Sequence, residues 1–154
     1  MKRGFTIVEL LIYIGIIGTL LTVLGGILIS TLDVQMESES TSAVEADGRF
    51  LLARLSYDLH QASSLTTPAA AGDTADSLGL TISGQTYTYA VTNSVMQLTT
   101  PSGSSPLTNP DVVVTNFSVT RLGNPGGLPT AQVNLTISHS QETRNYQISV
   151  GLRK

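Results

Sequence analysis

The 154-residue chain contains no cysteine and no tryptophan, and charged residues make up only 12% of it. Without cysteine the chain forms neither a disulfide nor a thiolate metal site, so its stability must come from packing. Eight basic side chains against eleven acidic ones leave a net charge of −3 and no positive surface for a phosphate backbone. The composition therefore disfavours nucleic-acid binding by the monomer, and the length favours about one domain.

A long hydrophobic segment lies close to the N-terminus. Glu9 is the only charged residue in the segment 5–32, and residues 10–32 are 23 consecutive uncharged residues. As a helix this run would be about 34 Å long, enough for a hydrocarbon core of about 30 Å and too long for a cleavable secretory signal. Lys2 and Arg3 precede the run and acidic residues follow it, so we expect a cytoplasmic N-terminus and an outward C-terminal domain.

Glu9 is the residue that a simple membrane anchor does not explain. A carboxylate at the centre of a spanning helix costs about 2.5–3.5 kcal/mol on insertion scales, so an acid in such a segment is by default a functional residue. The segment holds no basic side chain that could pair with it. We therefore expect Glu9 to have a partner outside its own helix.

Residues 2–12, KRGFTIVELLI, resemble the class III leader and N-terminus of type IV pilins and pseudopilins. The resemblance implies that residues 1–4 are a leader, that a prepilin peptidase cuts after Gly4, and that it methylates the new N-terminal residue, Phe5. Cleavage then creates an α-amino group that can neutralise Glu9 of a neighbouring subunit. Glycine at position 4 lacks a Cβ and gives the peptidase close access to the backbone.

Beyond the apolar segment, residues 33–64 continue as an amphipathic helix. Apolar residues recur there at three-, four- and seven-residue intervals, at Val44, Leu51, Leu55, Leu59 and Ala62. The pairs Glu45–Arg49 and Arg54–Asp58 have i,i+4 spacing, and we assign both to the solvated face.

After a surface loop over residues 69–76, the period of the pattern changes to two. Strands are predicted over 78–83, 85–91, 94–99, 111–121, 130–139 and 143–152, with tight turns at 83–85 and 92–94 and a longer loop over 101–110. The short loops imply antiparallel neighbours, and the apolar face of the sheet needs a cover. We therefore predict an α+β fold in which the second half of one N-terminal helix packs on an antiparallel β-sheet domain, residues 65–154. The pilin resemblance implies the same architecture.

Two further segments, 49–62 and 149–153, resemble minor pilins of the W type and J-type pseudopilins. Many major pilins close a C-terminal loop with a cysteine pair, which this chain lacks. These features favour a minor subunit over a major one.

Residue types that often serve in catalysis or metal binding have simpler structural explanations in this chain. His60 and His139, the only histidines, lie among many serines without a nucleophile-elbow motif, so we expect no catalytic site and no cofactor. Asp73 and Asp76 lie in a loop and could contribute to a Ca²⁺ site, but such a site takes six to eight ligands and we expect a solvated loop.

Two other sets of residues receive a structural explanation. The triplets Asn116-Phe117-Ser118 and Asn134-Leu135-Thr136 match the glycosylation pattern but fall in predicted strands, and we assign them no role. Three tyrosines at strand positions could form an adhesive surface, but sheet packing is the favoured explanation: these are Tyr87, Tyr89 and Tyr146.

Two classes of function fit these observations. The first is a structural subunit, of the minor kind, in a type IV pilus, type II secretion pseudopilus or competence pilus. The family implies other pilin subunits, a prepilin peptidase, a platform protein and an ATPase motor as partners, with a location in the cytoplasmic membrane and then at the cell surface. The second is an adhesin or binding module that remains anchored in the membrane and does not polymerise. Loss of the leader distinguishes the two.

Overall fold

The computed structural model describes residues 6–123, 127–140 and 142–153. These residues form an α+β fold, as predicted: one long helix, α1 (Ile7–Gln61), precedes all the strands. The strands are β1 (Ser64–Thr67), β2 (Thr74–Ala75), β3 (Ser77–Ile82), β4 (Gln85–Thr92), β5 (Val95–Thr100), β6 (Gly103–Pro106), β7 (Val113–Leu122), β8 (Thr130–His139) and β9 (Glu142–Gly151). The chain divides into two compact units at Glu39 and Ser40, so the second unit holds the last part of α1 and every strand.

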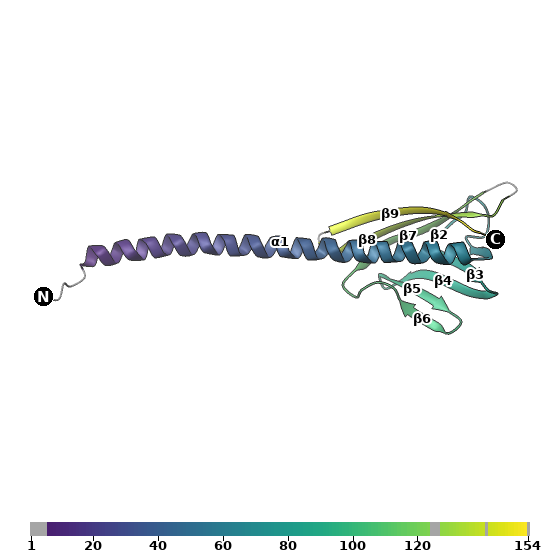
Figure 1. The fold of residues 1–154 in the computed structure, drawn as a ribbon, viewed down its shortest axis with the longest axis horizontal. Coiled ribbons are helices and arrows are strands. Elements are labelled where there is room, and N and C mark those ends of the chain that lie inside the picture. The colour runs from purple at the N-terminus through teal and green to yellow at the C-terminus, as the bar shows by residue number, and fades with distance from the viewer. Residues whose placement is uncertain (1–5, 124–126, 141, 154) are drawn as a thin grey trace. The chain divides into compact units, whose positions relative to one another are not determined.

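The strands form two antiparallel sheets instead of the single sheet that the sequence pattern suggested. Sheet A has the order β1-β3-β4-β5-β6, and sheet B has the order β2-β7-β8-β9 (Figure 1). The tight turns fall where they were predicted. Ser83 and Gly84 both have positive φ, at 53° and 77°, and so do Asn93 and Ser94, at 52° and 63°. Two successive residues with positive φ are typical of the type I′ turn, whose twist matches that of a β-hairpin.

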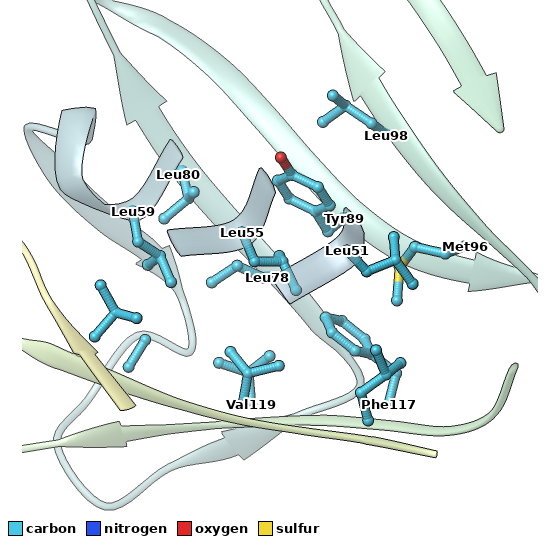
Figure 2. Packing of buried hydrophobic residues seen from close by; sticks show 14 of the residues in the cluster. Leu51, Leu55, Leu59, Leu78, Leu80, Tyr89, Met96, Leu98, Phe117 and Val119 are labelled. Carbon is cyan, nitrogen blue, oxygen red and sulfur yellow. The ribbon is translucent and has the colours of Figure 1, made fainter. Parts of the chain in front are cut away.

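The predicted stripe of α1 is the centre of the core. Its four residues, Val44, Leu51, Leu55 and Leu59, and Ala62 just after the end of the helix, are all 0–1% exposed. Figure 2 shows the leucines among side chains from both sheets: Leu78, Leu80, Tyr89, Met96 and Leu98 come from sheet A, and Phe117 and Val119 from sheet B. Fully burying one such side chain contributes about 1.5–3 kcal/mol, so the helix holds the two sheets together.

Three short strands and the end of the helix differ from the prediction. Helix α1 ends at Gln61, not near residue 64, because Ser63 already pairs with sheet A: its N–H donates to the Thr81 carbonyl at 2.8 Å. Strand β1 follows at once, while β2 and β6 lie within segments expected to be loops. All four residues of β6 are exposed, so this strand carries no alternating apolar pattern that the sequence could have revealed.

Candidate functional site

The N-terminal part of α1 exposes apolar side chains along its whole length. From Ile7 to Leu32 its large hydrophobic residues are 47–78% exposed, with Tyr13 at the lower limit. The helix is long and apolar enough to cross a membrane, and its most apolar window is 0% buried. A continuous apolar surface of this extent needs lipid or other protein chains to cover it. We therefore take residues 7–32 as the candidate functional site.

Glu9 is the only charged residue of this segment and lies in the first turn of α1. Its backbone N–H donates to Thr6 Oγ1 at 3.3 Å, so Thr6 caps the helix and Glu9 is the third residue of the first turn. A glutamate at this position completes a capping-box sequence pattern, and an acid in the first turn is favoured by the positive end of the helix dipole. Gly4 and Phe5, the predicted cleavage site, lie outside the described residues.

Threonine hydroxyls inside the apolar segment are satisfied by the helix itself. Thr19 Oγ1 donates to the Ile16 carbonyl at 2.8 Å, Thr22 Oγ1 to Gly18 at 2.9 Å and Thr31 Oγ1 to Ile27 at 2.9 Å. A hydroxyl that bonds to the preceding turn does not need water as a partner. These three residues are therefore compatible with an apolar surrounding.

Small residues line one side of the same segment. Gly18, Thr22, Gly26 and Ser30 follow one another at intervals of four, which places them along one side of α1. A Cβ built at Gly18 or at Gly26 would meet no described atom within 4 Å, so the surface at these positions is open. Small residues at this spacing allow two helix backbones to approach closely within a membrane.

The second unit contains a buried carboxylate that the sequence placed wrongly. Arg54 Nε does pair with Asp58 Oδ2, at 3.0 Å, but Asp58 is only 3% exposed and is not on a solvated face. The Tyr89 hydroxyl of sheet A donates a hydrogen bond to the same carboxylate oxygen. Burial, together with this hydrogen bond, raises the pKa of Tyr89. Asp58 therefore holds α1 against sheet A, whereas the pair Glu45–Arg49 is exposed as predicted.

A second buried carboxylate holds a loop against the helix. Asp47 accepts hydrogen bonds from the Asn109 backbone N–H at 2.8 Å and from Asn109 Nδ2 at 3.2 Å. Elsewhere in the domain, Arg121 donates to three backbone carbonyls of the segment 65–69, the shortest bond being 2.8 Å to Ala69. These contacts fix the loops of the domain and hold no reactive group ready for chemistry.

The other candidate residues belong to the second unit. His60 is exposed in the last turn of α1. His139 ends β8, and its buried Nδ1 has no hydrogen-bond partner among the residues that the structure describes. Asp73 Oδ2 accepts the Ala70 N–H at 3.0 Å and thereby closes a turn. Among the described residues, no group of three His, Cys, Asp or Glu side chains is placed to hold a metal ion. The tyrosines pack as predicted: Tyr89 is fully buried, and Tyr87 and Tyr146 lie against the core.

Comparison of the chain with protein-family models, with curated proteins and with solved structures finds no match. The long apolar N-terminal helix followed by a β-sheet domain is consistent with a pilin-like fold.

Proposed function

We propose that the chain is a structural subunit, of the minor kind, of a filament of the type IV pilus, type II secretion or competence class. The observation that carries the proposal is the apolar surface of residues 7–32, interrupted by a single charge at Glu9. A membrane anchor needs the apolar surface, whereas a charged acid within that surface raises the free-energy cost of insertion. A subunit that moves from lipid into a bundle of like helices needs the apolar surface, and it can pair the acid with a positive group of a neighbouring subunit.

Processing of the leader would supply the missing partner of Glu9. In the proposed pathway a prepilin peptidase cuts after Gly4 and methylates Phe5, which then directly precedes the capping residue Thr6. The new α-amino group carries a positive charge and can donate to the Glu9 carboxylate of an adjacent subunit. Because charge-assisted hydrogen bonds are directional, this contact would set the axial register of an incoming subunit.

The energetics of assembly follow from the same surface. Moving residues 7–32 from lipid to other helices exchanges one apolar contact for another, so the hydrophobic effect gives little net drive. Close packing along Gly18, Thr22 and Gly26, together with the pairing of Glu9, then selects the partner and its position. The family resemblance adds an ATPase motor and a platform protein that extract the subunit from the membrane, while the β domain faces outward.

Intact-mass measurement tests the proposal most directly. Co-expression with a prepilin peptidase should remove residues 1–4 and add one methyl group at Phe5, and Gly4→Val should block both changes. Sheared surface filaments should contain the processed chain. A chain that keeps residues 2–4 and fractionates only with membranes would instead support the anchored binding module.

A further inference from the structure

The face of sheet B that points away from the core carries an array of amides and hydroxyls. Along β8, Val133, Leu135 and Ile137 point into the core, so the residues between them point outward. The strand register aligns two rows of three side chains across β7, β8 and β9, which lie side by side in Figure 1. We call these six residues the amide patch: Asn116, Thr136 and Asn145 in one row, and Ser118, Asn134 and Gln147 in the next.

The amide patch explains the two triplets that match the glycosylation pattern. In an Asn-x-Ser/Thr triplet the first and third side chains share one face of a strand. Antiparallel pairing of β7 with β8 then places Asn116 opposite Thr136, and Ser118 opposite Asn134. The two triplets therefore form one continuous polar surface, to which β9 adds Asn145 and Gln147.

Much of the hydrogen-bonding capacity of this surface is not taken up by other side chains of the protein. Thr136 Oγ1 donates to Asn145 Oδ1 at 2.8 Å. The side-chain amides of Asn116, Asn134 and Gln147 form no hydrogen bond with any other residue that the structure describes. Five of the six patch residues, together with Leu135 and Tyr146, line a hollow of about 340 Å³. Each free amide offers two donors and an acceptor at the hollow.

The chemistry of the amide patch selects one class of ligand. The patch has no charge, and the next outward-facing row, Thr120, Gln132 and Ser149, has none either, so an anion or a cation finds no counter-charge. None of the six patch residues is a large apolar residue, and in the adjoining outward-facing rows only Val113 is apolar and exposed, which is too little apolar surface for a lipid. Amides donate and accept at the same site, as sugar hydroxyls do, and so match a neutral polyhydroxylated chain.

A second copy of the chain fits this surface less well. Two rows across three strands cover roughly 10 Å by 10 Å, whereas a stable protein–protein interface buries about 800 Å² per partner. We propose that the amide patch binds a neutral glycan, held by hydrogen bonds from Asn116, Asn134 and Gln147. The one aromatic residue that lines the hollow, Tyr146, turns its ring toward Gly48 of α1, so the contact is a hydrogen-bonded one that depends on the amides.

The binding test uses the full chain in lipid nanodiscs, since glycoside detergents would compete. Titration with chitohexaose and with cellohexaose separates N-acetylated from unsubstituted neutral glycans, and polygalacturonate serves as the anionic probe. At least one neutral oligosaccharide should bind saturably and more tightly than polygalacturonate. Asn134→Leu and Gln147→Leu should each weaken that binding at least fivefold. Gln85→Leu, at an exposed position at the start of β4, should leave it unchanged.

Nuclear magnetic resonance of the unmodified chain locates the contact without any variant. The side-chain amide signals of Asn116, Asn134 and Gln147 should shift on addition of the neutral oligosaccharide that binds, whereas those of Gln85 and Asn93 should not. The proposal is overturned if neither neutral oligosaccharide binds, if polygalacturonate binds as tightly, or if the shifts lie elsewhere. Self-association that Asn134→Leu abolishes would show instead that the patch contacts a second copy. These outcomes do not depend on leader cleavage or on filament assembly.

Discussion

Gly48 of α1 lies directly against the ring of Tyr146 of β9. A Cβ at position 48 would overlap the far end of that ring, and the Tyr146 hydroxyl donates to the Val44 carbonyl, one turn earlier in the helix, at 3.2 Å. Glycine in a helix ordinarily costs up to about 1 kcal/mol relative to alanine. Here the missing side chain creates the space in which β9 approaches the helix.

A double-mutant cycle should show that the effect of Gly48→Ala on stability changes sign when the Tyr146 side chain is removed. In a fragment of residues 33–154, Gly48→Ala should lower the free energy of unfolding by about 1 kcal/mol, since the displaced Tyr146 loses its hydrogen bond and packing. In a Tyr146→Ala background the same change should stabilise by up to about 1 kcal/mol through helix propensity. Urea unfolding followed by circular dichroism measures both, and equal effects in the two backgrounds would contradict the contact.

The buried stripe of α1 should be indispensable to the second unit. The fragment of residues 33–154 should be soluble and rich in strand, with one N-terminal helix. Leu55→Asp places an unpaired charge in the core, which costs several kcal/mol and approaches the whole stability of a small domain. Circular dichroism should show loss of the fold. Ala53→Asp, at an exposed position of the same helix, should leave the spectrum unchanged.

Tyr89 should contribute both stability and pH dependence. Tyr89→Phe removes a hydrogen bond to the buried Asp58 carboxylate and should lower the free energy of unfolding by about 1.5–3 kcal/mol. Because the pKa of Tyr89 is raised above its usual value of 10.0, the folded state keeps a proton that the unfolded state loses at high pH. Stability should therefore fall as the pH rises above 10.0, and less steeply in Tyr89→Phe. Tyr87→Phe is the matched control in both measurements.

Glu9→Gln should reduce filament assembly without affecting membrane insertion or cleavage. A glutamine at this position still suits the capping box with Thr6, and a neutral amide costs less in lipid than a charge does. The ratio of subunit in sheared filaments to subunit in membranes, at equal expression, should fall sharply. Glu37→Gln, which removes a charge beyond the apolar segment of α1, should leave the ratio unchanged. A normal ratio in Glu9→Gln would remove the assembly role.

The small residues of α1 should matter for packing between subunits. Gly18→Leu adds a bulky side chain at an open position and should still allow insertion, since leucine favours the bilayer. It should lower incorporation into filaments, because helices could no longer approach closely along that side. Leu24→Phe adds volume on the opposite side of α1, two residues from both Thr22 and Gly26, and serves as the comparison. Equal incorporation of the two variants would show that Gly18 does not lie at a helix–helix contact.

The periodicity of apolar residues in the sequence was sufficient to predict the long helix and the longer strands. The spacing of Leu51, Leu55 and Leu59 correctly predicted the buried side of α1, and alternation predicted β3, β4, β5, β7, β8 and β9 to within two residues at each end. These patterns are local, because a helix or strand must turn its apolar side chains to one side wherever the core lies. Glu9 also stands out in the sequence alone, as one charge within a long apolar run.

Contacts between residues far apart in the sequence decided the features that periodicity did not predict. Asp58 and Arg54 have the spacing of a surface ion pair, and only the approach of Tyr89 from sheet A buries the carboxylate. The exposed strand β6 exists because it pairs with β5, not because of its own pattern. The same is true of the amide patch: each triplet is visible in the sequence, but the register of β7 on β8 brings them together. Local patterns determine which side of an element is buried, whereas contacts between distant residues depend on how the elements meet, which a single segment does not encode.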